Sequence, residues 1–143
     1  MSSLTIESLL GGKEVIGQTI HTEMDLYELG KEGIPKRALL DLAHNTNMSL
    51  RTISHILHIT ERTLQRKRDS DLLNESISEH VIQIAEVYSR GNEVFDSVDD
   101  FQTWLNTANK ALGNRKPVEL MSSRYGAQMI LDELGRIEHG VFS

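Results

Sequence analysis

The chain has 143 residues, of which 38% are apolar and only 5% aromatic, with two prolines, no cysteine and a net charge of −6. This composition favours one helical domain, or two small subdomains that share a core, and the lack of cysteine excludes disulfides and thiolate metal sites or nucleophiles. No apolar run approaches the ~20 residues that span a bilayer and no signal peptide is evident, so we expect a cytoplasmic protein with no membrane partner.

Helical periodicity starts early in the chain. A short helix and a turn are expected around the Gly-Gly pair of LLGGKEVIG, within the first thirty residues. In the stretch GIPKRALLDLAHNTN, Pro35 suits the first turn of a helix because its missing N–H would have no partner there. Leu39, Leu42 and Ala43 follow at helical spacing, which predicts an apolar stripe that faces the core.

Two short helices are expected next. Ser49 can cap the first and Thr60 the second, because a hydroxyl oxygen at this position accepts a free backbone N–H of the first helical turn. The inward positions are Leu50, Ile53 and Leu57 in the first helix and Leu64 in the second.

Three longer helices are predicted in the second half of the chain. SISE at Ser76–Glu79 matches a capping box, and the helix that follows is expected to stop at Gly91. Ser97 with Asp100 forms a second box, and a third helix runs almost to the last residues. The apolar stripes are Ile77, Val81, Ile84, Ala85 and Tyr88, then Val98, Phe101, Trp104, Leu105, Ala108 and Leu112, and finally Ala127, Ile130, Leu131, Leu134 and Ile137. The predicted fold class is therefore all-α.

Basic residues are concentrated in the middle of the chain. Residues 30–73 contain eight Lys and Arg against five Asp and Glu. Residues 1–29 have one against five, and residues 74–143 have six against eleven. A basic segment between acidic flanks is typical of a DNA-binding module within a protein that has other functions. A chance cluster of solvated charges is the alternative.

A helix-turn-helix fits the stretch LRTISHILHITERTLQRKR, Leu50–Arg68. Two short helices cross steeply in that motif and need a small residue where they touch, which would be Ser54. His58 occupies the turn position where glycine is usual, so either it adopts a left-handed backbone or the turn is reshaped. Arg can bridge the guanine edge, Gln the adenine edge, and hydroxyls can bind phosphate. The residues expected to contact DNA are Arg51, Thr60, Arg62, Thr63, Gln65, Arg66 and Arg68. Two packed helices with a solvated basic face are the alternative.

Signals for an enzyme or a metal site are weak. His55 and His58 lie three residues apart, but one is expected on the surface and the other in the turn, so no metal site is expected. Asp99 and Asp100 fall in a first helical turn, where acidic side chains suit the helix dipole. Because no nucleophile–base pair and no phosphate-binding loop is present, the sequence predicts neither catalysis nor a cofactor.

Several stretches together resemble one known family. They are GIPKRAL, LHITERTLQRKR, EVF, the block WLNTANKALGNRKPVELMSSRYGAQMILDEL and the closing GRIEHGVFS. The chain resembles the Xre/MbcA/ParS family of bacterial antitoxins over nearly its whole length, most strongly over Trp104–Phe142. It departs from the family at Ala108 and Lys110, where prolines are common, and at Asn114, where a glycine is common.

The resemblance implies the antitoxin of a bacterial type II toxin–antitoxin system. Such an antitoxin represses its own operon through an Xre-like helix-turn-helix and neutralises its toxin with a C-terminal domain. The toxin is typically a RES-domain protein, similar to ADP-ribosyltransferases, that consumes NAD or modifies proteins with it. The expected division is an N-terminal helical region of residues 1–96, with the helix-turn-helix at about 49–68, and a toxin-binding domain of residues 97–143. Carried over by position, the toxin-contacting residues are Arg136, Glu138, His139, Gly140, Val141, Phe142 and Ser143.

The last predicted helix suggests how a toxin would be blocked. Its apolar stripe, extended by one step, reaches Val141 beyond Gly140, so Val141 and Phe142 are placed to enter the partly apolar NAD cleft of a toxin. The alternative is that these residues fold back on the core or pack in a homodimer. The rival function is a stand-alone helix-turn-helix transcriptional regulator whose C-terminal domain only dimerises, and a small enzyme is a further, weaker alternative.

Overall fold

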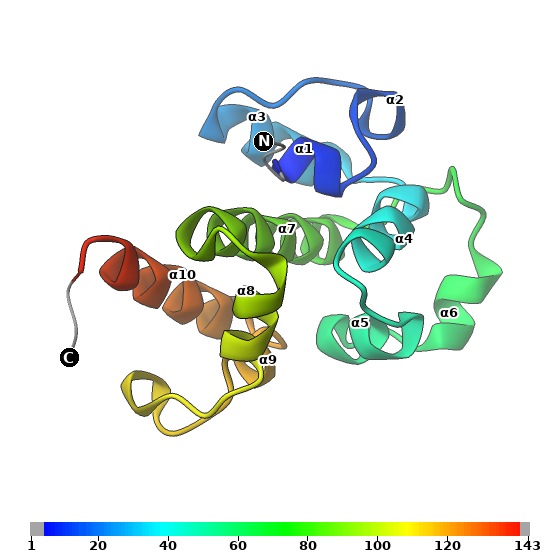
Figure 1. The fold of residues 1–143 in the computed structure, drawn as a ribbon. Coiled ribbons are helices and arrows are strands. Elements are labelled where there is room, and N and C mark those ends of the chain that lie inside the picture. The colour runs from blue at the N-terminus through cyan, green and yellow to red at the C-terminus, as the bar shows by residue number, and fades with distance from the viewer. Residues whose placement is uncertain (1–4, 141–143) are drawn as a thin grey trace.

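A computed structural model describes residues 5–140, and these residues form the predicted all-α fold (Figure 1). The helices are α1 (Ile6–Leu9), α2 (Lys13–Ile16), α3 (Glu23–Glu32), α4 (Lys36–Asn45), α5 (Leu50–Leu57), α6 (Glu61–Arg66), α7 (Glu75–Phe95), α8 (Val98–Leu105), α9 (Pro117–Leu120) and α10 (Arg124–Glu138), with a 3-10 turn, η1 (Lys110–Leu112), before α9. None of the described helices combines the length and the apolar character that crossing a membrane requires.

The longest helix, α7, lies at the centre of the fold. Helices α1 and α3 pack on one of its sides, and α8 and α10 pack on the other (Figure 1). Helices α5 and α6 lie at one end of the molecule, and the C-terminal end of α10 lies at the opposite end. A single apolar core, which includes Leu39, Ile84, Phe101 and Ile130, connects the elements on both sides of α7.

Most of the predicted apolar stripes are buried. Leu39 and Leu42 are fully buried on α4, as predicted. Trp104 is half-buried and packs against the core, with its ring centroid 5.7 Å from that of Phe95 and 6.0 Å from that of Phe101. The expectation that this tryptophan belongs to the core is confirmed.

The start of α7 differs from the prediction. The helix begins at Glu75, and its N-cap is Asn74, whose Oδ1 accepts the N–H of Ile77 at 2.9 Å. The capping box predicted at Ser76–Glu79 is therefore wrong, because Asn74 already satisfies the first turn two residues earlier.

The end of α7 differs as well. Gly91 does not stop the helix, which continues to Phe95 and has Asp96 as its C-cap in a left-handed conformation with φ 53°. A Cβ atom on Gly91 would overlap the ring of Phe101. The glycine therefore allows α8 to place an aromatic ring against α7, and it does not end the helix.

The segment after α8 is the third difference. The predicted stripe continued through Ala108 to Leu112, but α8 ends at Leu105. The side chain of Asn106 donates to a backbone carbonyl of the last turn at 2.9 Å, which competes with continuation of the helix. Ala108 is exposed. Leu112 is buried, but it belongs to the separate turn η1 and not to α8. Asn114 takes a left-handed φ of 62°, a conformation that asparagine tolerates better than most residues.

Candidate functional site

The helix-turn-helix predicted at about 49–68 is formed by α5 and α6. Ser49 Oγ accepts the N–H of Thr52 at 3.0 Å, and Thr60 Oγ1 accepts the N–H of Thr63 at 3.1 Å. Both predicted caps are thus confirmed. Each cap fixes the start of one helix, and the two helices contact each other directly.

Small and branched side chains form the contact between these helices. Ser54, at the position predicted for the contact, is only 3% exposed. Ile53, Leu57 and Leu64 are buried as well. Among the described residues the Ser54 hydroxyl has no hydrogen-bond partner.

His58 occupies the turn in a left-handed conformation, with φ 58° and ψ 39°, which is the first of the two alternatives that the sequence left open. Its side chain makes a contact that the sequence did not suggest, because Nε2 donates to the carbonyl of Ser122 at 2.8 Å. Ser122 lies between α9 and α10, 64 residues along the chain. The bond joins the turn of the helix-turn-helix to the C-terminal part of the protein and offsets the cost of a left-handed backbone.

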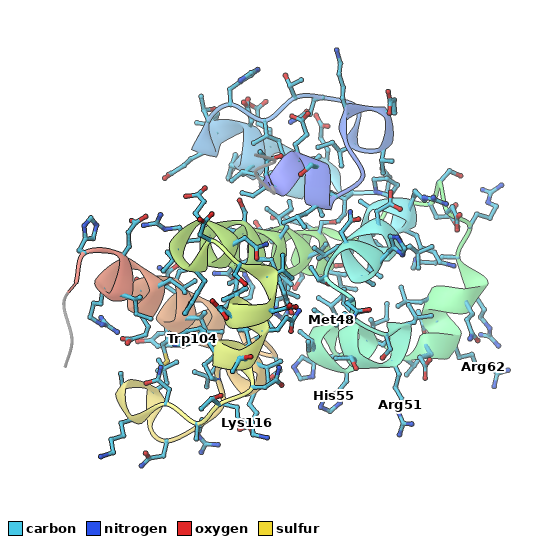
Figure 2. The ribbon with its side chains drawn as sticks, viewed as in Figure 1. Met48, Arg51, His55, Arg62, Trp104 and Lys116 are labelled. Carbon is cyan, nitrogen blue, oxygen red and sulfur yellow. The ribbon has the colours of Figure 1, made fainter. Side chains whose placement is uncertain are left out.

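The outward face of α5 and α6 is polar and basic. Arg51, Arg62, Gln65 and Arg66 are all exposed. Within the described part of the chain the three arginines form no ion pair, so their guanidinium groups are available to a ligand. Figure 2 shows Arg51 and His55 projecting from α5, and Arg62 from α6, on the side away from α7. Such a face suits phosphate and base-edge contacts.

The two threonines predicted to contact DNA, Thr60 and Thr63, form hydrogen bonds at the start of α6. Thr60 Oγ1 donates to Thr63 Oγ1 at 2.8 Å while it caps α6. Both residues are exposed at the N-terminal end of α6. A phosphate contact by Thr60 would therefore share the hydroxyl that caps the helix.

Arg68 does not lie on α6, contrary to the prediction. The helix ends at Arg66, and the backbone N–H of Arg68 donates to Asp71 Oδ2 at 2.8 Å. The Nε atom of Arg68 donates to the other carboxylate oxygen at 3.3 Å. The backbone bond lowers the pKa of the Asp71 carboxyl below its ordinary value. Arg68 is thereby held in a turn beyond the helix.

A buried lysine fixes the C-terminal end of α6. Lys36, the first residue of α4, donates from Nζ to the carbonyl of Lys67 at 2.9 Å. A cation near a helix C-terminus stabilises the last carbonyl groups. The orientation of α6 relative to α4 is thus set by a contact that spans 31 residues of sequence.

At the other end of the molecule, the last turns of α10 form ion pairs with the body of the protein. Arg136 Nε donates to Glu133 Oε1 at 2.8 Å. Both terminal nitrogens of Arg90 donate to Glu138, with Nη1 3.0 Å from Oε2. The Arg90 guanidinium lowers the pKa of the Glu138 carboxyl below its ordinary value. The polar ends of Arg136 and Glu138 are therefore already engaged within the chain.

Beyond these pairs, His139 and Gly140 are exposed. Gly140 adopts φ 70°, and no atom of the described residues other than its chain neighbour lies within 4 Å of the position that its Cβ would occupy. The other predicted toxin contacts, Val141, Phe142 and Ser143, lie outside the described residues.

Comparison with known proteins assigns both parts of the chain. Residues 90–140 match the antitoxin Xre/MbcA/ParS C-terminal toxin-binding domain, and residues 25–86 match the antitoxin Xre-like helix-turn-helix domain. The chain belongs to the Xre/MbcA/ParS antitoxin family. An antitoxin Xre from Yersinia enterocolitica is 34% identical over 87 residues, which are 59% of this chain and 59% of the length of that relative. The resemblance found in the sequence is confirmed.

In this Xre/MbcA/ParS protein, α7 contributes to both matched regions. The helix-turn-helix match ends within α7, and the toxin-binding match begins within the same helix. The boundary predicted between residues 96 and 97 stays a prediction.

A second histidine joins the two regions of the Xre/MbcA/ParS fold. His80, buried on α7, donates from Nε2 to the carbonyl of Met121 at 2.7 Å, next to the residue bonded by His58. Burial lowers the pKa of His80 below its ordinary value. Sequence reasoning missed both contacts because the bonded residues lie 41 and 64 positions apart.

The remaining candidates from the sequence lie apart from one another. Within the described residues of this family member, no group of three or more His, Asp or Glu side chains is placed to hold a metal ion. His55 is exposed on α5, whereas His58 is bonded to Ser122. Asp99 and Asp100 are exposed in the first turn of α8.

Proposed function

We propose that the protein is an antitoxin of a type II toxin–antitoxin system that binds DNA at one end and a toxin at the other. The supporting observation is the position of the exposed arginines. Those of α5 and α6 lie at one end of the molecule, and the C-terminal end of α10 lies at the opposite end (Figures 1 and 2). Binding of one partner therefore leaves the other surface accessible.

On DNA, α6 enters the major groove and presents Arg62, Gln65 and Arg66 to base edges. Arg51, Thr60 and Arg68 contact phosphates, together with Thr63 at the start of α6. One short helix makes few contacts, so the protein binds as a dimer to a two-fold operator whose half-sites are ~34 Å apart or a multiple of that distance. Binding at its own promoter represses the operon.

Charge reversal on α6 tests the DNA surface. In the double variant R62E/R66E we expect loss of operator binding in a gel-shift titration, with toxin neutralisation retained. The matched control is K13E/K31E, which makes the same change in charge on α2 and α3, on the other side of α7 from α5 (Figure 1). Unchanged operator affinity in R62E/R66E would exclude this surface.

For the toxin, we propose a RES-domain protein that binds NAD in a partly apolar cleft. The contacting segment is Arg136–Ser143, in which Phe142 enters or covers the cleft and blocks the substrate. Burial of a phenylalanine side chain contributes roughly 1.5–3 kcal/mol. Arg136 and Glu138 orient the segment from the rim through their pairs with Glu133 and Arg90, which fix the last turns of α10. A buried aromatic anchor with a polar rim concentrates binding energy in few residues.

Removal of residues 140–143 tests the toxin surface. The shortened protein should stay folded and bind its operator, because the described core lies upstream of these residues. In cells that express a RES-domain toxin, growth inhibition should return in whole or in part. If the shortened protein protects cells fully from the toxin, the body of the C-terminal domain is responsible for neutralisation. Failure of the intact protein to co-purify with such a toxin would favour a stand-alone regulator.

A further inference from the structure

A short basic segment interrupts the acidic C-terminal part of the chain. Residues 106–123 contain Lys110, Arg115 and Lys116 against a single acidic residue, Glu119. Arg115 and Lys116 are both exposed. The nearest elements in sequence are acidic, with Asp99 and Asp100 in α8 and several carboxylates in α10.

The charges of Arg115 and Lys116 are not used within the described structure. Neither residue forms an ion pair with a described side chain, whereas Arg90, Arg124 and Arg136 are each paired with a glutamate. The backbone that carries the two residues is ordered, because Asn109 donates its N–H to the carbonyl of Arg115 at 3.0 Å. Two free cationic side chains thus project from a defined turn.

Lys116 lies on the same side of the molecule as the exposed face of the helix-turn-helix. Figure 2 shows Lys116, His55, Arg51 and Arg62 along one edge, all on the side away from α7. Arg51 and Arg62 belong to α5 and α6, and Lys116 precedes α9. The basic face therefore continues from the reading helices onto the C-terminal part.

Three side-chain bonds to backbone carbonyls hold these parts in one arrangement. His58 donates to Ser122 at 2.8 Å, and His80 donates to Met121 at 2.7 Å, both in the connection that follows α9. Gln102 Nε2 in α8 donates to the carbonyl of Thr46, in the connection between α4 and α5, at 3.2 Å. Lys116 is therefore placed relative to α5 and α6 by direct contacts.

We propose that Arg115 and Lys116 form a second phosphate-binding surface, which contacts the DNA backbone beside the half-site read by α6. The inference rests on the proposed binding of operator DNA by α5 and α6. Duplex DNA is the partner because its phosphates form a continuous negative surface on either side of the groove that a reading helix enters. Lys116 is an exposed, unpaired cation on the same face as that helix and matches this surface in charge (Figure 2), and the exposed Arg115 precedes it in the chain. The toxin-binding domain thereby contributes to DNA affinity but not to sequence choice.

The test is the salt dependence of DNA binding by the full-length variant R115Q/K116Q. Each lost phosphate contact reduces the slope of log K against log[salt] by ~0.9, so the slope should become shallower by about 1.8. Affinity should fall by about tenfold for the operator and by the same factor for an unrelated duplex of equal length, because phosphate contacts carry no sequence information. Circular dichroism establishes that the variant keeps its helices.

Two further variants separate this inference from the proposed function. R62Q/R66Q should lose preference for the operator over the unrelated duplex, and K13Q/K31Q, on the other side of α7 from α5, should bind as the wild type does. An unchanged slope in R115Q/K116Q, with operator preference lost in R62Q/R66Q, overturns the second surface and leaves the DNA-binding helix in place. Operator preference retained in R62Q/R66Q overturns the proposed reading of the operator by Arg62 and Arg66 of α6, on which this inference rests. Loss of toxin capture in R115Q/K116Q, without a change in DNA binding, assigns the segment to the toxin and also overturns the inference.

Discussion

Gly91 and His58 each adopt a backbone conformation that is unfavourable in free energy for that residue type, and each makes a contact with a residue outside its own helix. A glycine inside a helix is less favourable than alanine by about 1 kcal/mol, but at position 91 the space of a side chain is occupied by the ring of Phe101. A left-handed backbone costs a residue with a Cβ about 1–2 kcal/mol, and at position 58 the ring gains a hydrogen bond to Ser122. At the scale of single residues, these choices serve tertiary contacts.

Substitution of Gly91 by alanine should destabilise the protein. The added methyl group would overlap the ring of Phe101, which is only 1% exposed and packs against the rings of Tyr88, Phe95 and Trp104. We expect a net loss of about 1–3 kcal/mol in the free energy of unfolding, measured with urea, despite the higher helix propensity of alanine. The matched control is G135A in α10, where, apart from the chain neighbours and the local helix backbone, no atom of the described residues lies within 4 Å of the added Cβ. This control should gain about 0.5–1 kcal/mol, and equal effects in the two variants would contradict the packing argument.

The stability of the protein should fall in mild acid because of His80. Burial lowers the pKa of this imidazole in the folded protein, whereas in the unfolded chain it titrates near 6.5. The unfolded state therefore takes up the proton first, so stability is retained above pH 6.5 and falls as the pH drops from there toward the lowered pKa. Between about pH 7.5 and about pH 5.5 the wild type should lose more unfolding free energy than H80Q, whose amide can still donate to Met121. Identical losses would rule out this histidine as the cause.

At the scale of the element, the caps decide where each helix begins. Ser49, Thr60 and Ser97 cap α5, α6 and α8 as the sequence predicted. At α7, the side chains of Asn74 and Ser76 could each accept a backbone N–H of the first turn, and the observed N-cap is Asn74. Asn74 directly follows Leu73, which is buried and whose N–H donates to the carbonyl of Ile34 at 2.8 Å. The chain is thus anchored just before Asn74, and the helix starts there.

Two alanine variants distinguish the caps at α7. N74A should lower the free energy of unfolding by about 1 kcal/mol, because it leaves the N–H of Ile77 without its acceptor. S76A, an exposed position inside the first turn, should change it by less than about 0.5 kcal/mol. Urea titrations of both variants measure the difference. A larger loss of unfolding free energy in S76A than in N74A would support the capping box that the sequence suggested.

At the scale of the whole molecule, α7 is shared between the two regions that the family comparison separates. It packs against α3 on one side and α10 on the other, and the apolar core is continuous across it. The proposed DNA and toxin surfaces lie at opposite ends of this arrangement (Figure 1). A common central helix keeps the two surfaces in a fixed relation.

A fragment of residues 97–143 should not fold alone. Without α7, the buried face of α10, which includes Ala127, Ile130 and Leu134, loses the helix against which it packs. Chains of this size rarely build a stable core. A longer fragment, residues 74–143, retains α7 with its cap and should show more helical circular dichroism per residue and a cooperative urea transition. Cooperative unfolding of the shorter fragment would show that the C-terminal domain is independent of α7.

The sequence by itself determined the helical fold class, most apolar stripes, the caps at Ser49 and Thr60, and the position of His58 in the turn. These features depend on interactions between residues three or four positions apart, or on the backbone preference of one residue, and such interactions are encoded locally. The family was also accessible from the sequence, because its motifs are distributed along most of the chain.

Only the tertiary structure decided which residues meet across the fold. The Arg90–Glu138 pair and the His58–Ser122 bond join positions 48 and 64 residues apart, and no local pattern specifies such pairs. Gly91 is a second case. Its low helix propensity suggested the end of a helix, but its role depends on the ring of Phe101, which reaches it only because α8 packs on α7. The common face of Lys116 and Arg51 is likewise a product of packing (Figure 2). Burial of apolar surface is non-directional, so a sequence indicates which helix faces are buried, whereas the fit of side chains in three dimensions selects their partners.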